Sequence, residues 1–179
     1  MNIYFYNINC KPRRKTEDLI RESVLRYAQF AGLQEKISFE IKRTQSGKPF
    51  LDGLPLCVGV SHTGNIAAIA VSGQGFGIDM ELKDRQITNL GVITKRFYFE
   101  REREFVNAAA AESEKNSRAL EIWVKKEAFL KCLGTGISEI NRADTEAVCG
   151  KFRKVEHKAM IIYVYFENKN ADEEIFCID

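Results

Sequence analysis

The chain has 179 residues, of which 45% are hydrophobic and 29% are charged. This composition is typical of a folded globular protein and excludes collagen, coiled-coil and intrinsically disordered chains. The length predicts one domain, or two small halves packed together. The formal net charge of +2 is too small for a dedicated nucleic-acid-binding protein, so any basic patch has to be found by position.

The cysteines and the apolar segments indicate where the protein works. The chain has five cysteines and no C-x-x-C pair, a pattern that favours neither a disulfide framework nor a zinc site. The first ten residues lack the basic start and the cleavage site of a secretory signal. The longest apolar run, residues 159–166, is far shorter than the roughly 18 residues of a membrane-spanning helix. We therefore expect a cytoplasmic protein without a membrane segment.

Along the chain, strands come first, and they surround one helix. Short runs rich in Ile, Val, Tyr and Phe predict strands over residues 2–9, 37–41, 56–60 and 66–71. A basic turn at 11–15 leads into a predicted helix from Thr16, its N-cap, to about Phe30. Residues 44–49 predict a turn. Ser61, His62, Thr63 and Gly64 are expected at the polar tip of a hairpin.

The middle of the chain is predicted to be helical and the tail to return to strands. Helix-compatible spacing covers residues 87–97, 100–111 and 114–133, and Gly134 and Gly136 are stop signals. The predicted strands of the tail are residues 148–155, 158–166 and 174–178. Strands and helices segregated in this way predict an α+β fold.

Two acids lie two residues apart where a predicted strand ends, in Gly77-Ile78-Asp79-Met80-Glu81. Because side chains alternate along a strand, Asp79 and Glu81 should project from one face while Ile78 and Met80 face the core. Two carboxylates on one side suit Mg²⁺, which takes one or two protein carboxylates and keeps other positions for phosphates. The alternative is a strand end with two solvated acids.

A second pair of charges lies on a helix that is apolar around most of its circumference. Glu127 and Lys131 are one turn apart in the segment 123–131, and a charge within an apolar surface needs a partner or a metal. The alternative is an ordinary surface pair, worth a few tenths of a kcal/mol.

Basic residues gather at two turns, Lys11, Arg13, Arg14 and Lys15 at the first, Arg43 and Lys48 at the second. Beside a carboxylate metal site they favour a ligand that carries several phosphates. At the predicted hairpin tip, His62 and two hydroxyls could also reach a ligand. No acid stands at the offset of a nucleophile triad, so Ser/His or Cys/His hydrolysis has little support.

Several motifs occur together and in order: Gly47-Lys48-Pro49, Ser61-His62-Thr63-Gly64, Gly77 to Glu81, Arg96 to Glu102, Trp123 to Lys131 and Gly134 to Ile137. Over residues 43–137 the chain resembles the 4′-phosphopantetheinyl transferases, of the surfactin-synthetase-activator type. The resemblance implies two similar α/β halves, 1–72 and 73–179, packed about a pseudo-twofold axis as a monomer. Val124 departs from the pattern, since many members carry Ser or Thr there.

The resemblance also implies an activity: transfer of the phosphopantetheine arm of coenzyme A to a serine of an acyl or peptidyl carrier protein, with release of adenosine 3′,5′-bisphosphate. Asp79, Glu81 and Glu127 would hold Mg²⁺, and Lys131 and His62 would contact phosphate oxygens. Glu127, or Glu102 through a water, would accept the serine proton. Lys48, Pro49 and Ser61, with Arg13, Arg14 or Arg43, would bind coenzyme A. Lys83, Arg85, Lys95 and Arg96 would face the carrier.

Two other functions are compatible with the same residues. One is a non-catalytic module that binds coenzyme A or a nucleotide. The other is a small Mg²⁺-dependent phosphohydrolase. The complete set of Asp79, Glu81, Glu127 and Lys131 argues against the first, because a degenerate member would be expected to lose a carboxylate.

Overall fold

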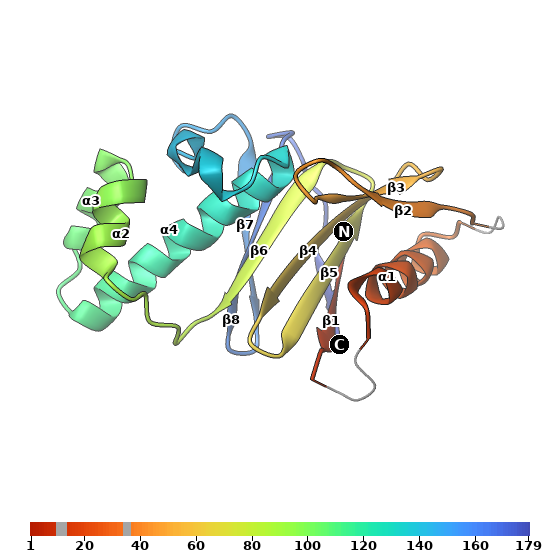
Figure 1. The fold of residues 1–179 in the computed structure, drawn as a ribbon, viewed down its shortest axis with the longest axis horizontal. Helices are drawn as coiled ribbons and strands as arrows, with labels where there is room; N and C mark the ends of the chain where they lie inside the picture. Colours follow the sequence, from red (N-terminus) through yellow and green to blue (C-terminus); the bar gives the residue numbers. More distant parts are fainter. Residues whose placement is uncertain (10–13, 34–36) are drawn as a thin grey trace.

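The computed structural model describes residues 1–9, 14–33 and 37–179 (Figure 1). The strands are β1 (Asn2–Asn7), β2 (Glu40–Arg43), β3 (Pro49–Asp52), β4 (Cys57–Thr63), β5 (Ile66–Ser72), β6 (Phe76–Leu82), β7 (Lys151–His157), β8 (Met160–Phe166) and β9 (Phe176–Ile178). The helices are α1 (Thr16–Phe30), α2 (Leu90–Phe97), α3 (Glu100–Asn107), α4 (Glu112–Leu133) and the 3₁₀ helix η1 (Ile137–Arg142). The predicted α+β class is confirmed.

The two main sheets share one topology. In the first, β1 is followed by α1, and the strand order β4-β5-β1 places the last strand of the unit in the middle. In the second, β6 is followed by α2, α3 and α4, and the order β6-β8-β7 repeats that arrangement. The C-terminal strand β9 crosses to the first sheet and pairs in parallel with β1, with Ile3 opposite Cys177. The chain therefore returns to the sheet in which it begins.

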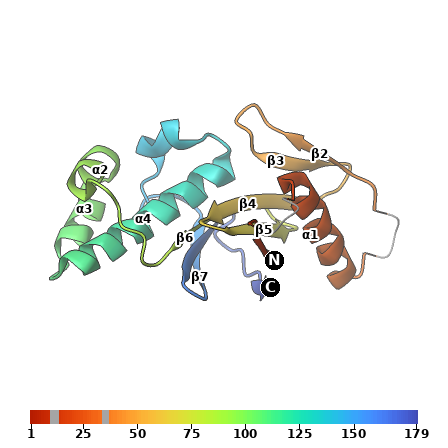
Figure 2. The same ribbon diagram turned by 60° about the horizontal axis from the view of Figure 1, so that its bottom comes forward.

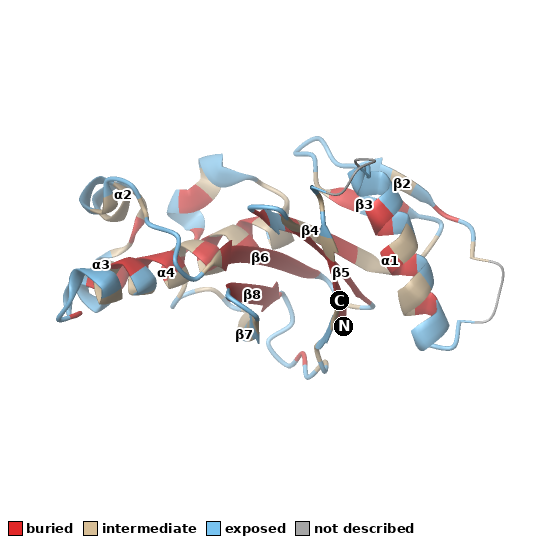
Figure 3. Ribbon diagram, turned by 90° about the horizontal axis from the view of Figure 1, so that it is seen from below, coloured by how far each residue is buried: buried red, intermediate tan, exposed pale blue. Residues whose placement is uncertain are grey.

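The sheets and helices form four layers (Figures 1 and 2). Leu19, Ile20 and Val24 of α1 pack on one face of the first sheet. The other face of that sheet packs on the second sheet, where Ile3 and Ala70 belong to one buried cluster with Ile78, Ile162 and other residues. α4 covers the outer face of the second sheet. Figure 3 shows the buried residues concentrated along β5, β6 and β8.

The close packing of α4 on β6 depends on one glycine. A Cβ atom at Gly77 would lie 2.0 Å from the carbonyl oxygen of Ala128 and 2.3 Å from the backbone nitrogen of Cys132. Both are backbone atoms of α4, so any side chain at this position would push the helix away from the strand. The glycine thereby fixes how near α4 lies to the carboxylates of β6.

Most predicted elements are present, but four predictions need correction. β4 continues through Thr63, and the turn is Gly64–Asn65, so Ser61, His62 and Thr63 lie in a strand and not at a hairpin tip. The predicted strand at 37–41 begins only at Glu40, and β3 replaces the end of the predicted turn. The N-cap of α1 is Lys15, one residue before Thr16.

Membrane and cysteine features can be stated for the described ranges. None of the helices there is long and apolar enough to cross a membrane. Four cysteines in these ranges, Cys57, Cys132, Cys149 and Cys177, are free thiols.

Candidate active site

Asp79 and Glu81 project from the face of β6 that α4 covers, as the alternation of the strand predicts, while Ile78 and Met80 enter the core between the sheets. Both carboxylates are held from β4. The hydroxyl of Ser61 donates to Asp79 Oδ1 at 2.8 Å, and the hydroxyl of Thr63 donates to Glu81 Oε2 at 2.7 Å. The two acids are therefore oriented by a strand of the first sheet.

The predicted side chains of α4 meet these acids. Lys131 Nζ donates to Asp79 Oδ1 at 2.6 Å and lies 3.3 Å from Ser61 Oγ. Glu127 stands one helical turn earlier and is partly buried. Burial and the neighbouring Asp79 carboxylate raise the pKa of Glu127, while Lys131 and Arg85 act in the opposite direction. The predicted grouping of Asp79, Glu127 and Lys131 is thus present in the structure.

The carboxylates differ in how their charges are balanced. Asp79 is paired with Lys131, and Glu81 is paired with Arg85, four residues further along the chain. Within the described ranges, no cation lies within ion-pairing distance of Glu127 and no hydrogen bond reaches it. Three acids against two bases leave one negative charge, so an oxygen-binding divalent cation fits the donor set.

The carboxylates are not arranged as a finished metal site. Among the residues that the structure describes, no three His, Cys, Asp or Glu side chains are close enough together to hold a metal ion. The bases Lys131 and Arg85 instead contact the acids directly. Side chains would have to shift for Asp79, Glu81 and Glu127 to share one ion.

A cavity of about 250 Å³ opens beside Glu127 and Lys131. Its opposite wall is formed by Arg43, Lys48 and Pro49. Lys48 Nζ donates to the carbonyl oxygen of Cys132 at 2.6 Å, which links the β2–β3 turn to the C-terminal end of α4. The cavity continues past Lys48 and Pro49 into a second, largely apolar one of about 720 Å³. The cleft is thus basic on one wall and carries both signs of charge on the other.

His62 lies on the opposite face of β4 from Ser61 and Thr63. It is exposed and lines a cavity of about 450 Å³ together with Arg14, Lys15 and the first turn of α1. The structure therefore groups His62 with Arg14, and not with Lys131 as the resemblance suggested. Ser61, by contrast, is buried, and its hydroxyl also accepts a hydrogen bond from the backbone nitrogen of Met80.

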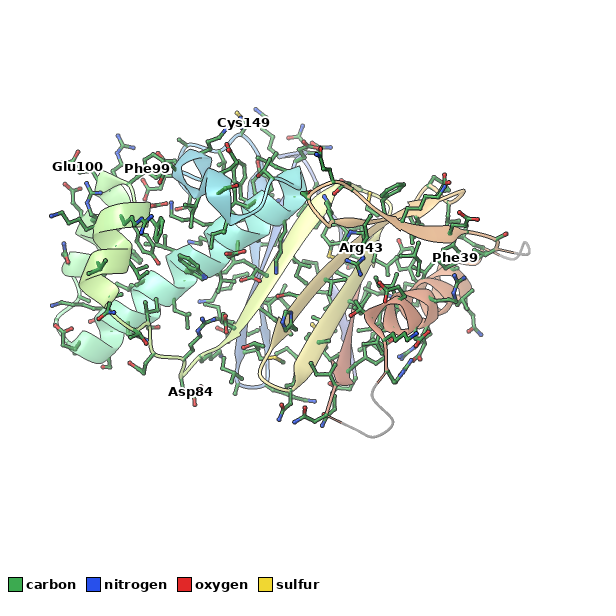
Figure 4. All side chains as sticks on the ribbon, in the orientation of Figure 1. Phe39, Arg43, Asp84, Phe99, Glu100 and Cys149 are labelled. Atoms are coloured by element: carbon green, nitrogen blue, oxygen red, sulfur yellow. The ribbon has the colours of Figure 1, made fainter. Side chains whose placement is uncertain are left out.

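The remaining predicted bases are spread around the cleft. Arg43 points from β2 towards α1 (Figure 4) and pairs with Glu17 at 2.7 Å. Arg14 pairs with Glu22. Arg13 lies outside the described residues. Arg14 and Arg43 are exposed, so both guanidinium groups can exchange their present partners for a ligand.

Glu102 does not join the other acids. Its side chain is 1% exposed and pairs with Lys126, which is 0% exposed, at 2.7 Å. Its oxygens also accept hydrogen bonds from the backbone nitrogens of Phe99 and Thr145. Because Lys126 precedes Glu127 on α4, its side chain points to a different side of the helix. Glu102 thus occupies a closed ion pair instead of the predicted place near the serine.

Two contacts of the site were not predicted from the sequence. Thr63 orients Glu81, a role that its position two residues after Ser61 indicates once β4 is known to continue that far. Arg85 pairs with Glu81, although it was expected to face a protein partner. An acid and a base four residues apart are too common in protein sequences to identify such a contact.

Comparison with known proteins agrees with this geometry. The family model of the 4′-phosphopantetheinyl transferase superfamily matches residues 75–174. The 4′-phosphopantetheinyl transferase gsp of Aneurinibacillus migulanus is 29% identical over 97 residues, 54% of this chain and 38% of that protein. The 4′-phosphopantetheinyl transferase HetI of Nostoc sp. is 32% identical over 116 residues, 62% of this chain and 46% of that protein.

The matched segments thus cover less than half the length of either relative. The family model, however, matches more than half of this chain and includes Asp79, Glu81, Glu127 and Lys131. On that match, the chain belongs to the 4′-phosphopantetheinyl transferase superfamily.

Proposed function

We propose that this protein transfers the phosphopantetheine arm of coenzyme A to a serine hydroxyl of an acyl or peptidyl carrier protein. The observation that carries the proposal is the meeting of Asp79, Glu81, Glu127 and Lys131 beside a cavity with a basic opposite wall. Such a site can bind a phosphate ester and stabilise the charge that grows on it during transfer.

Coenzyme A carries a pyrophosphate and a 3′-phosphate, and the cleft has a set of groups for each. Lys131 lies beside Asp79 and would contact the pyrophosphate. His62 and Arg14, on the other face of β4, would contact the 3′-phosphate. Lys48 and Pro49 would contact the adenosine, and Arg43 would lie at the rim of the cavity. The separation of His62 from Lys131 supports this division of the phosphates.

Mg²⁺ would be held by Asp79, Glu81 and Glu127, and when bound it would neutralise charge on the pyrophosphate. Ser61 and Thr63 keep two of these carboxylates aligned through hydrogen bonds. Lys131 can leave Asp79 and contact the phosphate oxygens of coenzyme A.

In the transfer step the serine oxygen forms a bond to the phosphorus that carries the pantetheine arm. The bond from that phosphorus to the bridging oxygen breaks, and adenosine 3′,5′-bisphosphate leaves with the electron pair. The serine proton passes to the carboxylate of Glu127. Among the described residues the Glu127 carboxylate has no ion-pair partner, so it can accept this proton.

We further propose that the protein acts as a monomer in the cytoplasm, with halves 1–72 and 73–179 related by a pseudo-twofold axis. The shared strand order of the two main sheets supports the relation between the halves. The free thiols of the described ranges suit a reducing compartment. Carrier proteins are commonly acidic near the serine, and the exposed bases Lys83, Lys95 and Arg96 would face them.

Incubation of an apo carrier protein with coenzyme A and Mg²⁺ tests the transfer. We expect the wild-type protein to add the mass of one phosphopantetheine group to the carrier. The Glu127→Gln variant should lose at least about 10²-fold in rate, because it can neither accept the proton nor supply a charged ligand. The matched control is Glu121→Gln on the same helix, whose acid contacts Tyr163 and Lys125 outside the cleft.

The assay also separates the competing functions. Consumption of coenzyme A without a mass change of the carrier would identify a phosphohydrolase. Binding of coenzyme A without turnover would identify a binding module. Transfer by Glu127→Gln at the wild-type rate would overturn the role of Glu127, provided that thermal melting shows all three proteins folded.

A further inference from the structure

Arg85 lies against Glu81, one of the three carboxylates proposed to hold Mg²⁺. Its guanidinium group pairs with Glu81 Oε1, while the other oxygen of the same carboxylate accepts the hydroxyl of Thr63 at 2.7 Å. With these two contacts, both oxygens of Glu81 are occupied within the protein, and the residue is buried. A cation can therefore approach Glu81 only against the positive charge of Arg85.

The backbone of Arg85 is fixed, although its side chain is not. Its carbonyl oxygen accepts a hydrogen bond from Asn116 Nδ2 at 2.8 Å, and Asn116 Oδ1 accepts from the backbone nitrogen of Ile87 at 2.8 Å. Asn116 is itself buried in α4. The arginine side chain, in contrast, is 51% exposed and can leave Glu81 without disturbing this anchor.

Among the residues that the structure describes, no neighbouring base repeats the contact of Arg85. Lys83, on the same loop, pairs with Glu156 at 3.4 Å. Asp84, between the two bases, points outward from the loop (Figure 4). Lys131 pairs with Asp79 and not with Glu81. Arg85 also acts on Glu127 through its charge. One half-exposed guanidinium group thus acts on two of the three carboxylates proposed to bind Mg²⁺.

We propose that Arg85 is a displaceable counter-ion of Glu81, which must leave this carboxylate before a divalent cation binds there. This inference rests on the proposed metal site of Asp79, Glu81 and Glu127. Arg85 is accordingly a positioning residue that keeps the buried carboxylate compensated and weakens metal affinity. Because the guanidinium and the cation compete for the same charge, removal of the arginine tightens metal binding.

Isothermal titration of the full chain with Mg²⁺ tests the competition. We expect Arg85→Gln to lower the dissociation constant for Mg²⁺ by about three- to fivefold, the upper part of the range that a half-exposed ion pair can supply. Arg85→Lys retains the charge and should stay within about twofold of the wild type, as should Lys83→Gln, which removes a base from the same loop. Asp79→Asn should abolish the binding and so confirms its location.

The outcomes separate this inference from the proposed function. Unchanged or weaker Mg²⁺ binding by Arg85→Gln would overturn the counter-ion role, even if the wild-type protein transfers phosphopantetheine. Equal tightening by Lys83→Gln would also overturn it, because any loop charge would then suffice. Failure of the wild type and of the Arg85 and Lys83 variants to bind Mg²⁺ would overturn it as well. The carrier assay would then show whether transfer itself occurs. Melting curves without metal verify that each variant is folded.

Discussion

At the residue scale, two Lys–acid pairs on α4 have opposite surroundings. Lys131 and Asp79 face the cleft, where the lysine is 35% exposed and can exchange its partner for a ligand. Lys126 and Glu102 are closed off from solvent. Burial lowers the pKa of Lys126, and the carboxylate of Glu102 opposes that shift. The first pair can serve chemistry, whereas the second holds α4 against α3 and the segment that follows η1.

The buried pair predicts a large cost for losing one partner. Lys126→Met should lower the free energy of unfolding by about 3–5 kcal/mol, because Glu102 would remain buried without a counter-charge. Lys125→Met, the neighbouring control, breaks a partly exposed pair with Glu121 and should cost about 1 kcal/mol or less. Urea denaturation measures both values. Similar costs for the two variants would show that the buried pair is not the clamp described here.

At the element scale, the site depends on how closely α4 approaches β6. The helix contributes Glu127 and Lys131, and the strand contributes Asp79 and Glu81. Gly77 lies against the backbone of Ala128 and Cys132, the residues that directly follow Glu127 and Lys131. The spacing of acids and base is thus set by a contact that contains no functional group.

Gly77→Ala should therefore damage both stability and activity. The added methyl group would displace α4, with a stability cost of about 1–3 kcal/mol or more. A shift of about 1 Å can lower a rate by about 10²-fold. Gly73→Ala is the matched control, because its Cβ would meet nothing within 4 Å. The carrier assay and thermal melting measure the two effects. Full transfer activity in Gly77→Ala would contradict this account of the helix position.

The sequence predicts local elements of the site well and their meeting poorly. Alternation along β6 is a local property, so the shared face of Asp79 and Glu81 could be predicted and is confirmed. The direction in which the His62 side chain points could not be predicted, because it depends on where β4 ends. Polar residues at 61–63 suggest a turn, yet in the fold two of them satisfy carboxylates of another strand. Nor does the sequence show that Glu102 and Lys126, 24 positions apart, form a pair.

At the scale of the whole molecule, one core joins the two main sheets. A single buried cluster contains Ile3 and Ala70 from the first sheet and Ile78, Ile162 and Val164 from the second. The C-terminal strand β9 also links the two sheets, because it follows β8 of the second sheet along the chain and pairs with β1 of the first. Although the two main sheets share a strand order, neither sheet can cover its inner face without the other. The site between them therefore exists only when both are folded.

This shared core predicts that damage in one half is felt in the other. Trp123 is the single tryptophan and lies in α4, packed on Phe97 with ring centroids 6.2 Å apart. Ile3 of β1 is fully buried, so Ile3→Ala should lower the free energy of unfolding by about 2–5 kcal/mol. We expect Trp123 fluorescence and far-ultraviolet circular dichroism to report the same lowered urea midpoint, as one cooperative transition requires. Val92→Ala, at an exposed position of α2, should leave both midpoints unchanged. If Ile3→Ala leaves the urea midpoint of Trp123 fluorescence unchanged, the segment that contains the second sheet folds alone. The cleft would then be a contact between independent units.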